Sequence, residues 1–167
     1  GFGSRRWFFE QVADRLADLR VQLHGNWQGL AEDSPLRAWI AAEDPAHCLD
    51  NDRAAQVYRS ARVGINLYRR EADGDTVTGG WAMGPREVEM AACGLFFLRD
   101  PRPEGDRLLS MLPTFDSPAE AVDLLRWYLP RPDTRVQLAA AAREAIDDRT
   151  FDHHARQLLR LLDASPV

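Results

Sequence analysis

The sequence predicts a single α/β domain built on a parallel sheet, and three observations lead to this fold class. Segments that alternate like strands follow segments with helical periodicity, and the chain closes in several helices. The length of 167 residues suffices for one sizeable core and is short for two. Residues 52–100 run helix, strand, loop, helix and strand, which is a βαβ crossover. We therefore expect one three-layer domain over residues 1–167.

The first fifty residues contain one strong helix and two weak strands. Apolar residues recur at helical spacing over residues 4–19, and Ser4 can cap this helix. Residues 20–25 alternate as a short strand, residues 35–43 can form a helical turn, and residues 46–49 form a weak further strand.

The central segment has the clearest boundaries. The side chains of residues 50–52 can cap the helix that follows them. Residues 62–68 form the strongest strand, and residues 94–98 form the next. The helix between these strands is bounded by Pro85, which suits a first helical position, and by Gly94, which suits a C-terminal cap.

The last third of the chain is predicted to be mainly helical. A short helix is expected at residues 107–111, and a short extended piece at residues 113–115. A Ser-Pro-Ala-Glu capping box opens a helix over residues 117–128, which a proline-rich turn ends. Two more helices follow at residues 133–148 and 150–163.

Composition and charge exclude several classes of protein. The net charge of −5 and the pI of about 5.4 argue against nucleic acid as a partner. No apolar run approaches the roughly 20 residues of a membrane helix, and no signal peptide is visible. Cys48 and Cys93 lack metal-like spacing, so we expect a reduced, cytoplasmic protein. All 21 basic residues are arginines, so a bound phosphate must be held by arginines, backbone amides or helix ends.

The loop over residues 69–84 is the expected ligand site, because it follows a strand at the carboxyl edge of the parallel sheet. Arg86 and Glu89 open the next helix. A buried Glu89 can accept both hydroxyls of a ribose, and Arg86 can hold a diphosphate together with free backbone amides. The alternative is an i, i+3 pair of these two residues on a solvated helix face.

A glycine turn at the start of the chain is a second candidate. Gly1, Gly3 and Ser4 could let the backbone approach a phosphate, with Arg5 or Arg6 supplying charge, although a bare turn explains them as well. No strand precedes this turn, so we expect the sequence to begin part-way into a longer protein.

Three further side chains are candidates for binding. Asn66 interrupts an apolar strand and needs a partner, either in neighbouring backbone or in a ligand. Trp27 and Trp81 fall in loops at presumed strand ends, where they can stack on a base or pack as part of a core or lid.

No metal centre or nucleophilic arrangement is predicted. The adjacent histidines at residues 153–154 point to different sides of a helix, and no acidic or cysteine cluster completes a shell. The Asp-x-Asp at residues 50–52 suits helix capping better than metal binding. The chain has no nucleophile elbow, P-loop or Ser/His/Asp pattern.

Most of the chain from Ala54 onward resembles the donor-binding half of GT-B glycosyltransferases, and is most similar to the CgeB-like branch of the group-1 transferases. The segments that carry the resemblance are VYRSARVGINLYRRE, PREVEMAACGLFFLRD, FDSPAEAVDLLRWYL and TFDHHARQLLRLLD. Their order and spacing match a strand ending in Leu-Asn, an R-x-F-E-x-x-A-x-G helix, and the helices that close this half.

The resemblance implies roles for individual residues. Glu89 matches the second glutamate of an E-x7-E pattern, which binds the donor ribose. Arg86 matches the arginine before it, Asn66 the strand asparagine, and Arg6 a basic residue near the glycine turn. The position of the first glutamate lies at or beside Trp81, a valine replaces the helix phenylalanine, and the phosphate lysine is missing. These departures leave catalytic competence open.

The resemblance also implies a function and a partner. It implies a Rossmann-like domain that is the second half of a GT-B fold in a bacterial, cytoplasmic protein. The activity would be the transfer of a sugar from a nucleotide sugar, with retention of configuration and without a metal ion. The nucleotide sugar would be the donor substrate, and no cofactor would be needed. The N-terminal half of the same protein would hold the acceptor and cover the apolar side of the last helix, and the isolated chain would turn over little. The alternative is a non-catalytic interaction domain that has lost the donor site.

Overall fold

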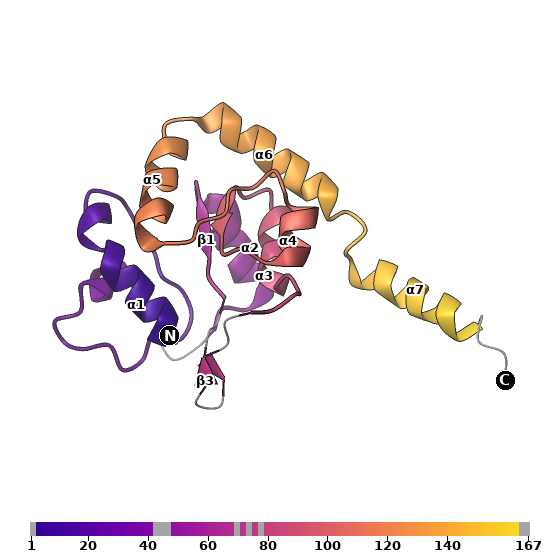
Figure 1. Ribbon diagram of the computed structural model, residues 1–167, viewed down its shortest axis with the longest axis horizontal. Coiled ribbons are helices and arrows are strands. Elements are labelled where there is room, and N and C mark those ends of the chain that lie inside the picture. The colour runs from indigo at the N-terminus through magenta and orange to yellow at the C-terminus, as the bar shows by residue number, and fades with distance from the viewer. Residues whose placement is uncertain (1–2, 42–47, 69–70, 73–74, 77–78, 164–167) are drawn as a thin grey trace.

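The computed structural model describes residues 3–41, 48–68, 71–72, 75–76 and 79–163 (Figure 1). Seven α-helices, two short 3-10 helices and four short strands are found in these residues. In chain order they are α1 (Gly3–Val12), η1 (Asp14–Leu16), η2 (Pro35–Trp39), α2 (Asn51–Ser60), β1 (Gly64–Asn66), β2 (Glu71–Ala72), β3 (Asp75–Thr76), α3 (Pro85–Ala92), β4 (Phe97–Arg99), α4 (Pro103–Leu108), α5 (Pro118–Tyr128), α6 (Pro132–Ala145) and α7 (Phe151–Asp163).

The strands β1 and β4 form a parallel pair, as the βαβ pattern predicts. Gly64 lies opposite Phe97, and Asn66 lies opposite Arg99. A third extended segment continues this sheet, because Thr114 forms a parallel bridge with Arg99. The carboxyl ends of all three segments therefore meet at one edge, and we call it the carboxyl edge.

The predicted strands before residue 50 are not formed as expected. Within residues 20–25, Leu23 makes one parallel bridge, to Ile40, and no longer ladder. Of the predicted strand at residues 46–49, the first two residues lie outside the described residues, and Cys48 and Leu49 are not in a strand. Leu23 is buried and its polar neighbours are not, so this segment brings little apolar surface to a sheet. The fold is a helix-rich α/β arrangement with a small parallel sheet, and the three-layer form remains a prediction.

Two connections also differ from the prediction. The loop over residues 69–84 contains a short antiparallel hairpin, in which β2 pairs with β3. The helix expected at residues 107–111 instead begins at Pro103 and ends at Leu108. Proline suits the first position of a helix, and the acidic residues of the first turn interact favourably with the helix dipole.

Helix caps agree with the sequence signals except at α1. The Asp50 carboxylate accepts a hydrogen bond from the Arg53 backbone N–H at 2.8 Å. The Ser117 hydroxyl accepts one from the Glu120 N–H at 3.1 Å, and Gly94 has the positive φ of 72° expected after a helix. The helix α1 already begins at Gly3, so Ser4 lies in its first turn and is not its cap.

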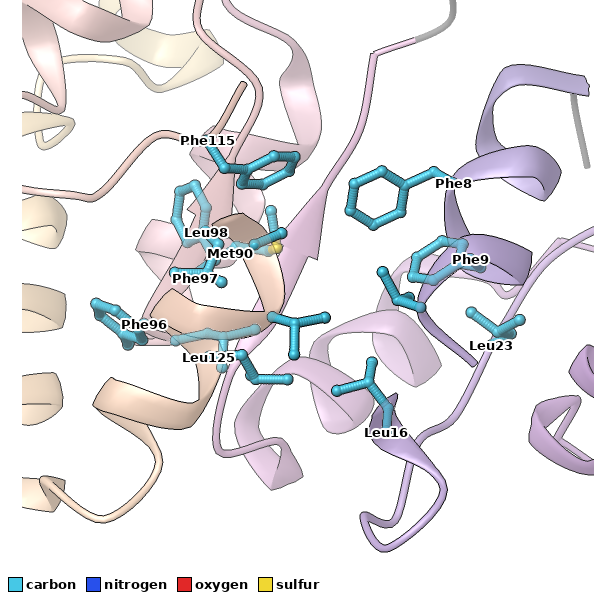
Figure 2. Packing of buried hydrophobic residues seen from close by; sticks show 14 of the residues in the cluster. Phe8, Phe9, Leu16, Leu23, Met90, Phe96, Phe97, Leu98, Phe115 and Leu125 are labelled. Atoms are coloured by element: carbon cyan, nitrogen blue, oxygen red, sulfur yellow. The ribbon is translucent and has the colours of Figure 1, made fainter. Parts of the chain in front are cut away.

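The hydrophobic core lies between the parallel strands and the helices α1, α3, α5 and α6. Phe8 and Phe9 of α1 lie on one side of this core, and Phe97 and Leu98 of β4 lie on the other side, together with Leu125 of α5 (Figure 2). Phe97 and Leu98 have no exposed surface, which is typical of strands covered on both faces. The helices α1 and α5 are thereby fixed on the same side of the sheet, next to its carboxyl edge.

The last helix, α7, leaves this core and projects from the rest of the chain (Figure 1). Phe151 is 95% exposed, and Leu158, Leu159, Leu161 and Leu162 are each about 60% exposed. No side chain of α7 is buried. Among the described residues, no helix is both long and apolar enough to cross a membrane.

Candidate functional site

A pocket of about 230 Å³ opens at the carboxyl edge of the sheet. Its wall combines the residues that directly follow three parallel segments with the first turns of α1 and α5. These residues are Ser4, Arg5, Trp7, Phe8, Leu67, Tyr68, Asp100, Phe115, Asp116, Ser117 and Pro118. This is the edge at which open α/β sheets bind their ligands, so we take it as the candidate site.

Arg5 supplies a positive charge to this pocket. It lies in the first turn of α1, and its Nε donates a hydrogen bond to the Leu67 carbonyl at 3.0 Å. This bond ties the start of α1 to the chain that follows β1. A guanidinium beside the N-terminus of a helix is a suitable group for a phosphate, because both carry positive charge.

Asp100 holds the ends of the two strands together. Its side chain is buried, and its Oδ2 accepts a hydrogen bond from the Tyr68 backbone N–H at 2.8 Å. Its own N–H donates to the Asn66 carbonyl at 3.1 Å. Asp100 therefore fixes the position of Tyr68 on the pocket wall.

Behind the pocket wall, Tyr68 contacts a fully buried carboxylate. Its hydroxyl donates to Glu87 Oε2, and the Gly84 backbone N–H donates to both oxygens, at 3.0 Å to Tyr68 Oη and 3.1 Å to Glu87 Oε2. Burial raises the pKa of Glu87, opposed by these hydrogen bonds and by the charge of Arg99. Burial and the Glu87 carboxylate also raise the pKa of Tyr68.

A buried arginine completes this group. Arg99 is 1% exposed, and its Nη1 lies 2.7 Å from Asp106 Oδ1. A Cβ at Gly105 would lie 2.9 Å from that Nη1 and 3.6 Å from Glu87 Oε1, so a larger residue there would require the guanidinium to shift. We call Tyr68, Glu87, Arg99 and Asp106 the buried polar cluster.

Arg86 and Glu89, the predicted ligand residues of α3, do not line the pocket. Both lie close enough to Tyr58 of α2 for their charges to act on its hydroxyl. Burial, followed by the negative charge of Glu89, raises the pKa of Tyr58, while Arg86 lowers it. Their assigned contacts with a ribose and a diphosphate remain predictions.

The glycine turn is part of α1. Gly3 is the first residue of that helix, and Ser4 lies in the pocket wall, whereas Gly1 is outside the described residues. Arg6 donates to the carbonyls of Gly29 at 3.0 Å and Gln28 at 3.2 Å. Of the two arginines that the sequence left open, Arg5 is the one that lines the pocket.

The predicted tryptophans lie elsewhere. Trp27 is buried against Phe9, and its indole N–H donates to the His24 carbonyl at 3.1 Å. Trp81 is 64% exposed and does not line the pocket. The tryptophan in the pocket wall is Trp7, which helical periodicity alone does not separate from its buried neighbours.

Asn66 is buried at the end of β1, and its carbonyl is bonded within the sheet edge. Asp100 and Asp116 are not among the site residues predicted from the sequence. The available signal was their position, because each directly follows a segment that ends at the carboxyl edge. Within the described part of the chain, no group of three or more His, Cys, Asp or Glu side chains could hold a metal ion.

The comparisons with known proteins give one match. The model of a family described as glycosyl transferase-like matches residues 5–160. Searches of curated proteins and of solved structures give no match.

Proposed function

The chain belongs to the glycosyl transferase-like family, and on this premise we propose that it is the nucleotide-sugar-binding half of an enzyme that transfers a sugar to an acceptor. The observation that carries this proposal is the pocket at the carboxyl edge, where Arg5 and the start of α1 meet the ends of β1 and β4. Parallel α/β sheets bind nucleotides at this edge.

Arg5 and the first turn of α1 would hold the donor diphosphate. The chain has no lysine, so arginine and backbone N–H groups must supply the positive charge. When the sugar leaves, negative charge grows on the diphosphate, and groups fixed in advance around it lower the barrier. The bond from Arg5 Nε to Leu67 provides such fixation. A reaction of this kind needs no metal ion.

The nucleoside would extend from this point toward α3. In this proposal Glu89 accepts the ribose hydroxyls in place of its present contact with Tyr58, and Arg86 adds charge at the start of the helix. This assignment, the retention of configuration and a place in the CgeB-like branch of a bacterial cytoplasm rest on the resemblance of the sequence segments.

The acceptor and part of the chemistry would come from an N-terminal half of the same protein. The exposed apolar side of α7 supports this, because such a surface normally lies against a partner. Phe151, Leu158 and Leu162 would be buried there. With half of the cleft absent, this chain alone would bind the donor weakly and turn over little.

The second candidate function is a non-catalytic interaction domain. It is favoured by Trp81, which stands at or beside the position of an expected glutamate, and by the exposed face of α7. This reading predicts that the chain binds no nucleotide.

Calorimetric titration of the chain with UDP, GDP and their sugar conjugates separates the two functions. We expect one nucleotide series to bind, and Arg5→Ala to weaken it by about 10-fold or more, since a charge-assisted hydrogen bond contributes about 1.5–3 kcal/mol. Glu89→Ala and Arg86→Ala should weaken the same series. Arg143→Ala, on the exposed surface of α6, is the matched control and should change nothing. An absence of binding in every series, in this chain and in the full-length protein, would favour the interaction domain.

A further inference from the structure

The pocket at the carboxyl edge is too small for a whole nucleotide sugar. Its volume of about 230 Å³ is below the roughly 300–1,000 Å³ of pockets that enclose drug-sized ligands. It can hold one ring with its substituents, and the rest of the donor must lie outside it.

The charges in the pocket wall argue against a phosphate inside the pocket, so the diphosphate would lie at its mouth, beside Arg5 and the start of α1. Two carboxylates, Asp100 and Asp116, line the pocket together with a single guanidinium, that of Arg5. A third carboxylate is adjacent, because Glu120 Oε2 accepts a hydrogen bond from the Asp116 N–H at 2.8 Å. The Glu120 carboxylate accepts from the Asp116 N–H, just before α5, and the Ser117 hydroxyl accepts from the Glu120 N–H in its first turn. Because these N–H groups are occupied, the start of α5 attracts an anion less strongly.

The wall therefore carries more negative than positive charge, because Asp100 and Asp116 outnumber the single guanidinium of Arg5. A carboxylate has only acceptor positions, so it suits a ligand group that donates, such as a hydroxyl or an ammonium. A carboxylate on the ligand would meet an excess of charge of its own sign in this pocket.

Aromatic side chains form much of the remaining wall. Phe8 and Phe115 lie with their ring centroids 5.5 Å apart, which Figure 2 shows as two rings pointing toward one another. Trp7 also lines the pocket and is 56% exposed. The C–H face of a sugar ring is apolar and packs well on an aromatic surface, while its hydroxyls reach polar groups at the rim.

We propose that this pocket takes the sugar ring of the donor, and that it selects neutral or amine-bearing sugars over sugars that carry a carboxylate. Asp116 would accept a hydrogen bond from a sugar hydroxyl, and Trp7 would cover one face of the ring. This inference rests on the proposed function, since it assumes that the ligand is a nucleotide sugar.

Asp116 is the better residue for a test. It is exposed, and its backbone N–H, not its carboxylate, makes the bond to Glu120, so Asp116→Asn should leave the fold intact. Asp100 is buried and accepts from Tyr68, so its replacement disturbs the wall as well as the charge. Asp133→Asn, at the exposed start of α6, removes the same charge away from the pocket and is the matched control.

The experiment is a calorimetric titration with UDP, UDP-glucose and UDP-glucuronate, which differ only in the sugar. GDP, GDP-mannose and GDP-mannuronate are run beside them, so that either base is covered. We expect the neutral sugar conjugate to bind more tightly than the free nucleotide, and about 10-fold more tightly than the uronate. Asp116→Asn should reduce this ratio severalfold, and more so at low salt, whereas Asp133→Asn should leave it unchanged.

Two results would overturn the inference alone. Equal affinity for the neutral sugar and the uronate would remove the selection by charge, and a ratio that Asp116→Asn does not change would place the selection elsewhere. In both cases binding of the free nucleotide still supports the proposed function. If neither the nucleotides nor their conjugates bind, in this chain and in the full-length protein, the inference and the proposed function fail together.

Discussion

The buried polar cluster and α7 both reverse the usual distribution of side chains. In the cluster, the ionisable side chains of Glu87 and Arg99 are only 0% and 1% exposed. In α7, Phe151 and four leucines carry apolar surface at 58–95% exposure. Interior charges and exposed leucines are both costly, and a chain retains them where something else offsets the cost.

The difference between the two regions lies in where that compensation comes from. The cluster is compensated in part within the chain, because Tyr68 and Gly84 donate hydrogen bonds to Glu87 Oε2 and Asp106 supplies a charge opposite to that of Arg99. In the part of the chain that the structure describes, Glu87 Oε1 and Arg99 Nε and Nη1 have no hydrogen-bond partner. The leucines of α7 have no such cover among the described residues. The cluster should therefore determine the stability of this chain, and α7 should matter for its association with a partner.

Arg99→Ala should have the largest effect on stability. It removes the positive charge beside Glu87 and leaves a buried carboxylate without an opposite charge, which typically costs about 3–5 kcal/mol. Urea unfolding followed by circular dichroism measures this loss. The control, Arg143→Ala on the surface of α6, should change the free energy of unfolding by less than about 0.5 kcal/mol. A loss below about 1 kcal/mol for Arg99→Ala would show that the cluster is not structural.

Leu98→Ala gives the reference for apolar burial. Leu98 has no exposed surface, so its truncation should lower the free energy of unfolding by about 2–5 kcal/mol. The paired change, Leu158→Ala in α7, should lower it by less than about 0.5 kcal/mol, because that side chain is exposed. The same urea titration measures both. Similar losses in the two variants would mean that α7 packs on the body of this chain.

Glu87→Gln should change the pH dependence of stability. The pKa of Glu87 is raised in the folded state, so the folded state binds more protons than the unfolded state above the ordinary value of about 4.3. The contribution of Glu87 to the free energy of unfolding is fully present below that pH, and it is lost as the pH rises through the pKa of the folded state. The stability of the wild type relative to Glu87→Gln should therefore fall from pH 4 to pH 8. A constant difference across this range would contradict the assignment.

Local signals in the sequence predicted the elements that local residues determine. Pro85 and Gly94 bound α3 as expected, and Asp50 and Ser117 cap their helices. The parallel pairing of β1 and β4 followed from the βαβ order. The strand predicted at residues 20–25 is reduced to one bridge, because one buried leucine between polar residues does not determine a ladder.

The site depended on contacts between distant residues, which one sequence does not reveal. Glu87 contacts Tyr68 and Arg99 only after β1, α3 and β4 pack together. Its role is therefore not visible in the sequence, which instead favours Glu89, two residues away, as the functional glutamate. The choice between Arg5 and Arg6 likewise depends on the rotation of α1 against the strands. The resemblance to a family implies that Glu89 binds the donor ribose and that Arg86 binds the diphosphate. These roles are tested by titration with a nucleotide sugar.

The most direct test of the account is the NMR spectrum of the five tryptophan indole N–H groups during titration with a nucleotide sugar. The signals can be assigned by single Trp→Phe substitutions. The account predicts that Trp7, in the pocket wall, shifts and saturates with added UDP-glucose or GDP-mannose, while Trp39 in the core and Trp127 at the end of α5 do not. A saturating shift of Trp27 or Trp81 with no change at Trp7 would contradict the proposed site.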